Sequence, residues 1–410
     1  GHAQKTGAGE KGLFFRKNSG NKRIHLDYAS TTPVCAEVFD AMRPYFSEVW
    51  ANPSAIYKEG VTARKVVEDA RGELARTLRV RASDVTFTSG GTESNNLALI
   101  GLVEALHDDG RPYKEMEIIS TKIEHPSILE TLSYVEKRGV RIVSAPIDEF
   151  GLINFRSFET LLTPHTVLVT FAYANSEVGA VQDVKKLSRA VRLYNDEHKT
   201  KIFTHVDASQ APLWLSCELD MLGVDIMTLD AGKCYGPKGV GVLAHRHWVK
   251  LNPFMHGGGQ ETGLRSGTEN TALIVGCVRA IVSAQANYKN QSEVTAKLRD
   301  AFFTLLTKEI PTSIVNGSRE SRIANNINIS IPNLDTEYAV IWLDSKGIAC
   351  STKSACGTSD STGSSVVREM TGNNARATST IRFTLGEEST KPDIEKAVQI
   401  LKEHISLMKK

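Results

Sequence analysis

A lysine in the second half of the chain lies where its amine could act as a nucleophile. Residues 226–229 form an apolar run typical of a buried strand, and residues 236–239, Gly-Pro-Lys-Gly, are typical of a tight turn. Lys233 lies between them. A lysine that is partly removed from water can lose its proton there and form a Schiff base with a carbonyl compound. Taken alone, this segment favours an ordinary surface lysine, so residues elsewhere must decide.

A glycine-rich turn offers a place for a phosphate. Residues 88–96 read Thr-Ser-Gly-Gly-Thr-Glu-Ser-Asn-Asn and join an expected strand to an expected helix. Gly90 and Gly91 let the backbone approach a ligand, and the N-terminus of a helix presents unpaired N–H groups to an anion. Thr92 adds a hydroxyl group. Such turns are also common as purely structural connections, so the motif alone is not specific.

An acid and an imidazole follow two other expected strands. Asp207 ends a buried run at 202–206, where a carboxylate is costly unless a positive group pairs with it. A protonated pyridine nitrogen would be such a group. A helix N-cap is an equally good interpretation of this aspartate. His125 could place its ring against a flat ligand, whereas a buried histidine bonded to the backbone is the alternative.

Composition excludes several classes of function. The chain has 410 residues, 41% of them apolar and 23% charged, which is ordinary for a soluble globular enzyme. The net charge of +2 gives no reason to expect direct contact with nucleic acid or with an anionic membrane. No stretch is long and apolar enough to cross a bilayer. Six scattered cysteines form neither a disulfide framework nor a zinc motif, so we expect free thiols and no metal site.

The elements that position these residues alternate along the chain. Residues 36–50 carry helical spacing, and residues 61–78 form an amphipathic pattern with one apolar face. Strands and helices then alternate, which indicates an α/β layer with a mostly parallel sheet flanked by helices. The expected buried strands are 85–88, 116–120, 140–143, 167–171, 202–206 and 226–229.

The pattern changes beyond about residue 287, where a smaller α+β domain is expected. Residues 323–331 alternate as a half-buried strand should, and an amphipathic helix is expected at 391–408. The predicted division therefore has three parts. These are a flexible N-terminal arm with a tag remnant at 1–22, a large domain at 38–286, and a small domain made of 23–37 and 287–410 that carries a Ser- and Gly-rich loop at about 351–365.

Each candidate group follows an expected strand, on the side where open α/β sheets bind ligands. The order of phosphate turn, histidine, Asn175, aspartate and lysine resembles the fold-type I pyridoxal-phosphate enzymes. Within them, the motifs resemble the cysteine desulfurases of the NifS/IscS type, which are similar to class V aminotransferases and have a seven-stranded sheet. The motifs are 26–33 (LDYASTTP), 91–93 (GTE), 124–125 (EH), 175–179 (NSEVG), 206–210 (VDASQ), 233–239 (KCYGPKG), 265–268 (RSGT), 354–356 (SAC) and 381–386 (IRFTLG).

This resemblance assigns a role to each residue around pyridoxal 5′-phosphate. It implies that Lys233 holds the cofactor as a Schiff base, that Asp207 pairs with the pyridine nitrogen, and that His125 stacks on the ring and takes part in catalysis. Gln210 and Asn175 would reach the phenolic oxygen. The remaining implied contacts are Gly91 and Thr92 with the phosphate, Thr268 with the phosphate from a second subunit, and Arg382 and Asn175 with the substrate.

The resemblance also selects one cysteine. Cys356 would attack the sulfur of the substrate, release alanine and keep a persulfide, and its place in a flexible segment suits a group that carries sulfur away. Cys234 is the obvious rival, but a residue fixed beside Lys233 cannot move to an acceptor. Cys217 and Cys277 are expected to be packing residues, and Cys350 is expected to be structural.

Three positions depart from the family pattern. Asp230 and Gly232 stand where a serine and a histidine usually contact the cofactor phosphate, and Tyr57 stands where a histidine is usual. An aspartate beside a phosphate dianion should repel it unless the carboxylate turns away or bonds a donor. The resemblance therefore predicts weaker cofactor binding than is usual in the family.

The implied function is that of a homodimeric cysteine desulfurase. It would convert L-cysteine to L-alanine and pass sulfur to acceptor proteins, such as an iron–sulfur scaffold, or into tRNA thiolation. The expected location is the cytoplasm, or the mitochondrial matrix in a eukaryote. The alternatives are a selenocysteine lyase or related pyridoxal-phosphate β-lyase, an aminotransferase, and a non-catalytic scaffold of a sulfur-transfer complex.

Overall fold

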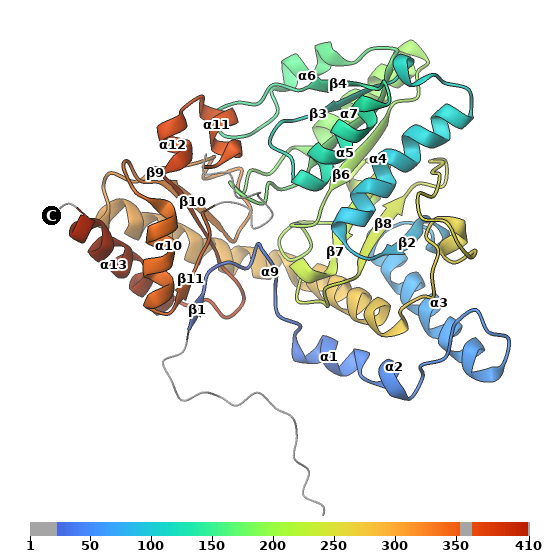
Figure 1. Ribbon diagram of the computed structural model, residues 1–410, viewed down its shortest axis with the longest axis horizontal. Coiled ribbons are helices and arrows are strands. Elements are labelled where there is room, and N and C mark those ends of the chain that lie inside the picture. The colour runs from blue at the N-terminus through green and yellow to red at the C-terminus, as the bar shows by residue number, and fades with distance from the viewer. Residues whose placement is uncertain (1–22, 353–362, 409–410) are drawn as a thin grey trace, which may run out of the picture.

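The computed structural model describes residues 23–352 and 363–408, which form two lobes with separate sheets (Figure 1). The predicted arm at 1–22 lies outside the described residues, and so does Cys356. Within the described ranges, no helix is both long and apolar enough to cross a membrane.

The large lobe is built on a seven-stranded sheet with one antiparallel member. Every strand runs parallel to the others except β8, which is antiparallel to both of its neighbours. The predicted fold class, an α/β protein with a mostly parallel seven-stranded sheet, is confirmed. In spatial order the strands are β2 (Val85–Thr88), β8 (Gly241–His245), β7 (Ile226–Asp230), β6 (Phe203–Asp207), β5 (Thr166–Ala172), β3 (Glu117–Ser120) and β4 (Arg141–Ser144).

Helices cover both faces of this sheet, which is why its central strands are apolar runs rather than alternating ones. One face packs against α4 (Gly91–Asp108) and α5 (Pro126–Lys137). The other face packs against the remaining helices of the lobe, in the largest apolar cluster of the described chain. These helices are α1 (Ala36–Met42), α3 (Lys58–Leu78), α6 (Phe155–Leu161), α7 (Val184–His198) and α8 (Leu219–Leu222), whereas the short α2 (Pro44–Ser47) lies against α1 and α9.

One helix joins the two lobes. Helix α9 (Thr271–Glu309) has 39 residues and is therefore about 58 Å long. Its first half packs through Ile274 and Ile281 into the core of the large lobe, and its second half packs through Phe302 and Leu306 into the core of the small lobe. The domain boundary proposed at residue 286 falls inside this continuous helix.

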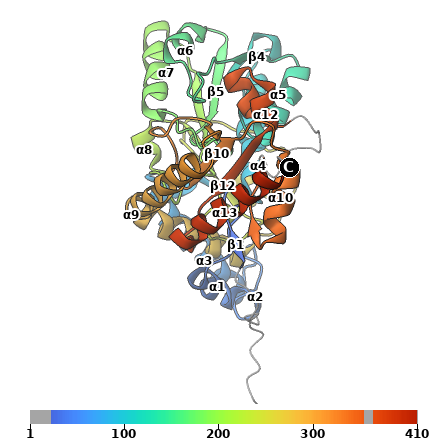
Figure 2. The same ribbon diagram turned by 90° about the vertical axis from the view of Figure 1, so that its left-hand side faces the viewer.

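The small lobe contains two short sheets. A three-stranded antiparallel sheet has the order β12 (Thr380–Thr384), β10 (Asn326–Ser330), β9 (Ile314–Val315), and β1 (Ile24–His25) pairs in parallel with β11 (Ile348–Ala349). Figure 2 shows β10 and β12 in front, with α9 and α13 alongside. The helices are α10 (Thr336–Ser345), α11 (Ser365–Thr371), α12 (Asn374–Thr378) and α13 (Lys391–Met408).

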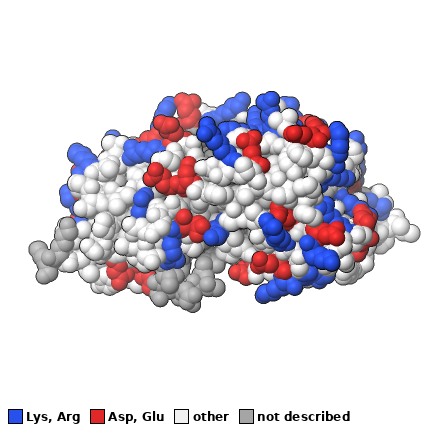
Figure 3. Space-filling model, turned by 90° about the horizontal axis from the view of Figure 1, so that it is seen from above, with Lys and Arg blue, Asp and Glu red and all other residues white. Residues whose placement is uncertain are grey.

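The surface carries both signs of charge close together. On the face seen in Figure 3, Lys and Arg side chains are interspersed with Asp and Glu side chains over both lobes. This face therefore lacks the single-sign field by which proteins attract a nucleic-acid backbone.

Candidate active site

The carboxyl ends of three neighbouring strands open into one cavity. The last residues of β5, β6 and β7 line it, together with the first turns of α4 and α5 and one side chain of the small lobe. Strand ends of an open α/β sheet are the usual place for a ligand. The sequence-predicted residues that this cavity brings together are Gly91, Thr92, His125, Asn175, Asp207, Gln210, Lys233 and Arg382.

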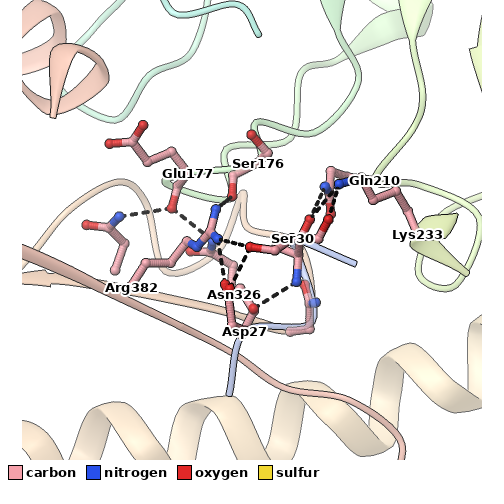
Figure 4. A network of polar contacts seen from close by, with 12 residues as sticks. Asp27, Ser30, Ser176, Glu177, Gln210, Lys233, Asn326 and Arg382 are labelled. Carbon is pink, nitrogen blue, oxygen red and sulfur yellow. Dashed lines mark hydrogen bonds and ion pairs between the residues drawn. The ribbon is translucent and has the colours of Figure 1, made fainter. Parts of the chain in front are cut away.

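Lys233 ends the short 3-10 turn that follows β7 (Ala231–Lys233). Its Nζ donates to the backbone oxygens of Ala29, at 3.1 Å, and Ser30. Gln210 donates to the same Ala29 oxygen at 3.0 Å, as Figure 4 shows. The amine is therefore held by a segment that enters from the small lobe directly after β1.

Asp207 is buried, with only 9% of the residue exposed. Its carboxylate accepts hydrogen bonds from the Asn95 amide at 2.9 Å, from the Ser209 N–H at 3.0 Å and from the Ser209 hydroxyl at 2.6 Å. No Lys, Arg or His nitrogen of the described chain lies within 4.0 Å of it to form an ion pair. A buried carboxylate at a cavity without its own cation fits a ligand that brings one, such as a protonated pyridine nitrogen.

His125 caps the N-terminus of α5. Its Nδ1 accepts the Ser127 backbone N–H at 3.1 Å and lies 2.8 Å from the Ser127 hydroxyl, so the bonded, buried histidine that the sequence allowed is present, but at the cavity wall. Burial lowers the pKa of His125, the charge of Lys233 lowers it further, and Asp207 opposes both. The neutral imidazole therefore carries its proton on Nε2, because Nδ1 is the acceptor.

Sequence reasoning missed three groups beside these. Asn95 donates at 2.9 Å to Asp207 and at 2.9 Å to the hydroxyl of Ser127, which is itself the partner of His125, so these four side chains form one network. Glu124 is fully buried, and burial raises its pKa to about 8, with Asp207 adding to the shift and Thr121 opposing it. At neutral pH this residue is therefore mostly a neutral acid.

Asn175 has one amide hydrogen left for a ligand. Its Nδ2 donates to the Ile123 oxygen at 2.8 Å, and its Oδ1 accepts the backbone N–H groups of Glu177 and Val178, both at 2.9 Å. The side chain therefore fixes the turn that follows β5. An Asn Nδ2 has two hydrogens, and the second is free to reach into the cavity.

Arg382 lies on β12 and is 1% exposed. Its Nη2 forms an ion pair with Asp27 at 2.7 Å and a hydrogen bond with the Ser30 hydroxyl at 3.2 Å, and its Nη1 donates to the Ser176 oxygen at 2.8 Å (Figure 4). Ser30 also donates to Asp27 at 2.6 Å. Ser30 therefore contacts both cations of the cavity: its hydroxyl accepts from Arg382, and its backbone oxygen accepts from Lys233. Asp27 belongs to the motif at 26–33, but nothing in the sequence indicates its partner, which is 355 positions away.

The carboxylate of Asp230 lies at the N-terminus of α4. The Gly91 N–H, which the sequence assigns to a phosphate, donates to Asp230 at 3.3 Å, and Asp230 also accepts the Gly232 N–H at 2.8 Å. The sequence predicted that an aspartate here would repel the phosphate unless its carboxylate bonds a donor. The structure shows such donors, the backbone N–H groups of Gly91 and Gly232.

Thr268 lies outside the cavity of a single chain, in the exposed loop that leads to α9. The preceding turn is fixed by Glu261, which forms a buried bidentate pair with Arg71 at 2.7 and 2.8 Å and accepts the Phe87 N–H at 2.9 Å. A contribution of Thr268 to a site in a second subunit remains a prediction.

The buried cysteines of the described chain are poor nucleophiles. Burial raises the pKa of the Cys234 thiol well above its usual value, and it does the same for Cys217 and Cys277. It raises the pKa of Cys350 to about 12. Because the thiolate is the reactive form, none of these four residues is activated at neutral pH.

Comparison with known proteins gives one consistent family. The model of the class-V aminotransferases matches residues 24–397. The cysteine desulfurase IscS of Dictyoglomus turgidum is 36% identical over 388 residues, covering 95% of this chain and 96% of that protein. A probable mitochondrial cysteine desulfurase of Dictyostelium discoideum is 34% identical, over 95% of this chain and 85% of its own length.

Solved structures agree. A NifS-like protein superposes with a TM-score of 0.86 at 31% identity, over 94% of this chain and all of that one. SspA in complex with cysteine superposes with a TM-score of 0.75 at 32% identity, over 88% of this chain and 98% of the other. The chain therefore belongs to the class-V aminotransferase family, among its cysteine desulfurases of the IscS and NifS type.

Proposed function

We propose that the protein is a pyridoxal-phosphate-dependent cysteine desulfurase. It removes sulfur from L-cysteine, giving L-alanine and a persulfide on Cys356. The observation that carries this proposal is the cavity in which the amine of Lys233, the uncompensated carboxylate of Asp207 and the guanidinium of Arg382 meet. The amine can bond the aldehyde of the cofactor, the carboxylate can pair with its pyridine nitrogen, and the guanidinium can bind the carboxylate of an amino acid.

Pyridoxal 5′-phosphate is the cofactor of this family, and it supplies an electron sink for the bonds around the substrate Cα. Lys233 would hold it covalently, Asp207 would pair with its ring nitrogen, and the α4 N-terminus with Thr92 would face its phosphate. Asn95 and Ser209 keep Asp207 in place. The neutral imidazole of His125 would lie against the ring and hold or release a proton at Nε2.

Arg382 is proposed to bind the substrate carboxylate. Among the described residues, the partners of Arg382 leave one Nη1 hydrogen and the buried Nε–H unused. The bonds that Arg382 donates to Asp27 and to the Ser176 oxygen fix the plane of the guanidinium, so the carboxylate meets a preoriented group.

Cys356 is proposed to accept the sulfur. Its thiolate forms an S–S bond as the substrate C–S bond breaks, and the electron pair of that bond stays with the carbon, which takes a proton to become the methyl group of L-alanine. Ser351, at the start of the Ser- and Gly-rich loop expected at about 351–365, pairs with the Arg382 backbone at 2.7 and 3.1 Å. This pairing supports a role for the loop near the proposed substrate carboxylate.

Mass spectrometry tests the proposal. After incubation of the cofactor-loaded protein with L-cysteine, the peptide that contains Cys356 should carry one additional sulfur atom, and L-alanine should appear in equal amount. Thiol reduction should remove the sulfur. A protein that consumes no L-cysteine, or that forms the persulfide on another residue, contradicts the assignment.

Asp27 should matter for substrate binding in particular. Asp27→Ala leaves the buried Arg382 without its ion pair and with only the Ser176 and Ser30 oxygens to orient it, so we expect KM for L-cysteine to rise about tenfold with little change in kcat. In Asp27→Asn, which keeps an acceptor for Nη2 of Arg382, KM for L-cysteine should lie between the values of the wild-type protein and Asp27→Ala. Asp344→Ala is the matched control, since Asp344 forms an exposed pair with Arg23 in the same lobe. A loss of bound cofactor at unchanged KM would mean that Asp27 only stabilises the fold.

The protein is also proposed to act as a homodimer in which the partner subunit's Thr268 completes the phosphate site. An apolar surface supports this, because Phe46, Trp50 and Ile56 are 59%, 72% and 92% exposed in a single chain. Sedimentation should give about twice the 44.9 kDa mass. Ile56→Asp should shift the protein toward monomer, whereas Ile341→Asp, equally apolar and 63% exposed on α10, should not. A monomeric wild-type protein would contradict this proposal.

The sulfur is proposed to pass from Cys356 to an acceptor protein, for iron–sulfur cluster assembly or tRNA thiolation, in the cytoplasm or the mitochondrial matrix. The relative of Dictyostelium discoideum named as mitochondrial supports the second location. Free cysteines in the described chain agree with a reducing compartment. Cell fractionation that places the protein in an oxidising compartment would contradict it.

A further inference from the structure

Asp230 occupies the anion-binding end of α4. Its two carboxylate oxygens divide between two backbone donors, with Oδ1 accepting the Gly232 N–H at 2.8 Å and Oδ2 accepting the Gly91 N–H at 3.3 Å. The first bond caps the 3-10 turn that carries Lys233. The second uses the first helical N–H of α4, where the positive end of the helix dipole favours one anion.

No cation of the described chain neutralises this carboxylate. None of the ion pairs among residues 23–352 and 363–408 includes Asp230. The cations of the cavity have other partners, since Lys233 is bonded to the Ala29 and Ser30 oxygens and Arg382 is paired with Asp27. His125 is a neutral imidazole, as described above. Asp230 therefore brings to the α4 end of the cavity a negative charge that no ion pair of the described residues neutralises.

The space around this amide is also small. A methyl group added at Gly91 would come within 3.0 Å of the Ser209 hydroxyl and 3.3 Å of the Asp230 carboxylate. The Gly91 N–H already has Oδ2 of Asp230 as its acceptor, so a phosphate oxygen that binds this N–H competes with Oδ2, and the dianion then lies beside a carboxylate.

We propose that Asp230 is a built-in competitor for the cofactor phosphate, so that this site binds the phosphorylated cofactor more weakly than its backbone geometry allows, while the affinity for the same ring without a phosphate is unaffected. The inference rests on the cofactor assigned under the proposed function. The inference concerns the affinity for the cofactor and not the reaction with L-cysteine, so the test contains no L-cysteine.

The experiment compares two ligands on apoprotein, pyridoxal 5′-phosphate and unphosphorylated pyridoxal, each titrated by visible absorbance. Asp230→Asn removes the charge and keeps an acceptor for the Gly232 N–H, so the Lys233 turn is preserved. We expect Kd for pyridoxal 5′-phosphate to fall about tenfold or more, and Kd for pyridoxal to change by less than about twofold. Asp230→Ser should give the same pattern, which guards against an effect peculiar to the amide.

Asp225→Asn is the matched control. Asp225 lies at the opposite end of β7 and bonds Thr204 and Trp248, so the substitution removes the same charge far from the cavity. It should change neither Kd. Three outcomes would overturn the inference. Asp230→Asn could raise the affinity for both ligands equally, or leave the affinity for pyridoxal 5′-phosphate unchanged. Asp225→Asn could raise the affinity for pyridoxal 5′-phosphate as much as Asp230→Asn does. Absence of persulfide formation alongside the expected binding pattern would refute the proposed activity and leave this inference intact.

Discussion

Lys233→Ala should give a folded protein that retains no covalently bound pyridoxal phosphate and turns over L-cysteine at least about a thousandfold more slowly. The expectation follows from the position of the amine. Lys233 lies at the end of β7, its Nζ bonded to the oxygens of Ala29 and Ser30, in the same cavity as Asp207 and Arg382. The described residues bring no other lysine into that cavity.

Borohydride reduction followed by peptide mapping measures this directly. In the wild-type protein the cofactor should be fixed to the peptide that contains Lys233, and the visible absorbance of the protein should disappear in Lys233→Ala. Lys238→Ala is the control, because Lys238 lies five residues further along and donates only to the Thr32 oxygen at 3.2 Å. A label on any other side chain would refute the assignment. A wild-type protein that stays colourless after addition of cofactor would instead support a non-catalytic scaffold.

Cys356→Ser should abolish persulfide formation and sulfide release from L-cysteine while leaving cofactor binding unchanged. A serine hydroxyl cannot form the S–S bond that removes sulfur from the substrate, so no slower version of the same step remains. The measurements are sulfide release, the mass of the peptide containing residue 356, and the visible spectrum. Release of selenium from selenocysteine by the same variant, measured in parallel, separates a desulfurase from a selenocysteine lyase.

The rival thiol provides the control for this experiment. Cys234 is adjacent to Lys233 but is 2% exposed, and burial raises its pKa well above the usual value. Cys234→Ala should therefore keep the persulfide on residue 356. Sulfide release that survives in Cys356→Ser and is lost in Cys234→Ala would reverse the roles of the two residues.

The sheet and most of the cavity were predictable because they depend on local patterns. Apolar runs mark the parallel strands, and a polar residue at the end of each run marks the cavity edge, which is how Asp207 and Lys233 could be found. Pattern alone gave one helix at 36–50, whereas the structure has α1 and α2 divided at Arg43, because Pro44 lacks the N–H needed to continue the first helix.

The partners of these residues were not predictable, because they come from distant parts of the chain. Asp27 meets Arg382 across 355 positions, and Asn95 meets Asp207 across 112. Asp27 lies in the motif at 26–33 and Asn95 in the turn at 88–96, but no local pattern assigns either residue a partner. The bond between Asp230 and Gly91 is of the same kind, since the conflict with a phosphate was predictable but the donors that relieve it were not.

The pairing of β1 with β11 sets a constraint on biosynthesis. Ile24 pairs with Ile348, so the first described strand waits for a segment made 324 residues later, roughly 16–65 s at usual ribosomal speeds. The seven-stranded sheet is complete in the nascent chain before then. The segment that holds Lys233 and Arg382 together docks only when the end of the message is being read, so a prematurely terminated product would contain an assembled sheet but an unassembled catalytic centre.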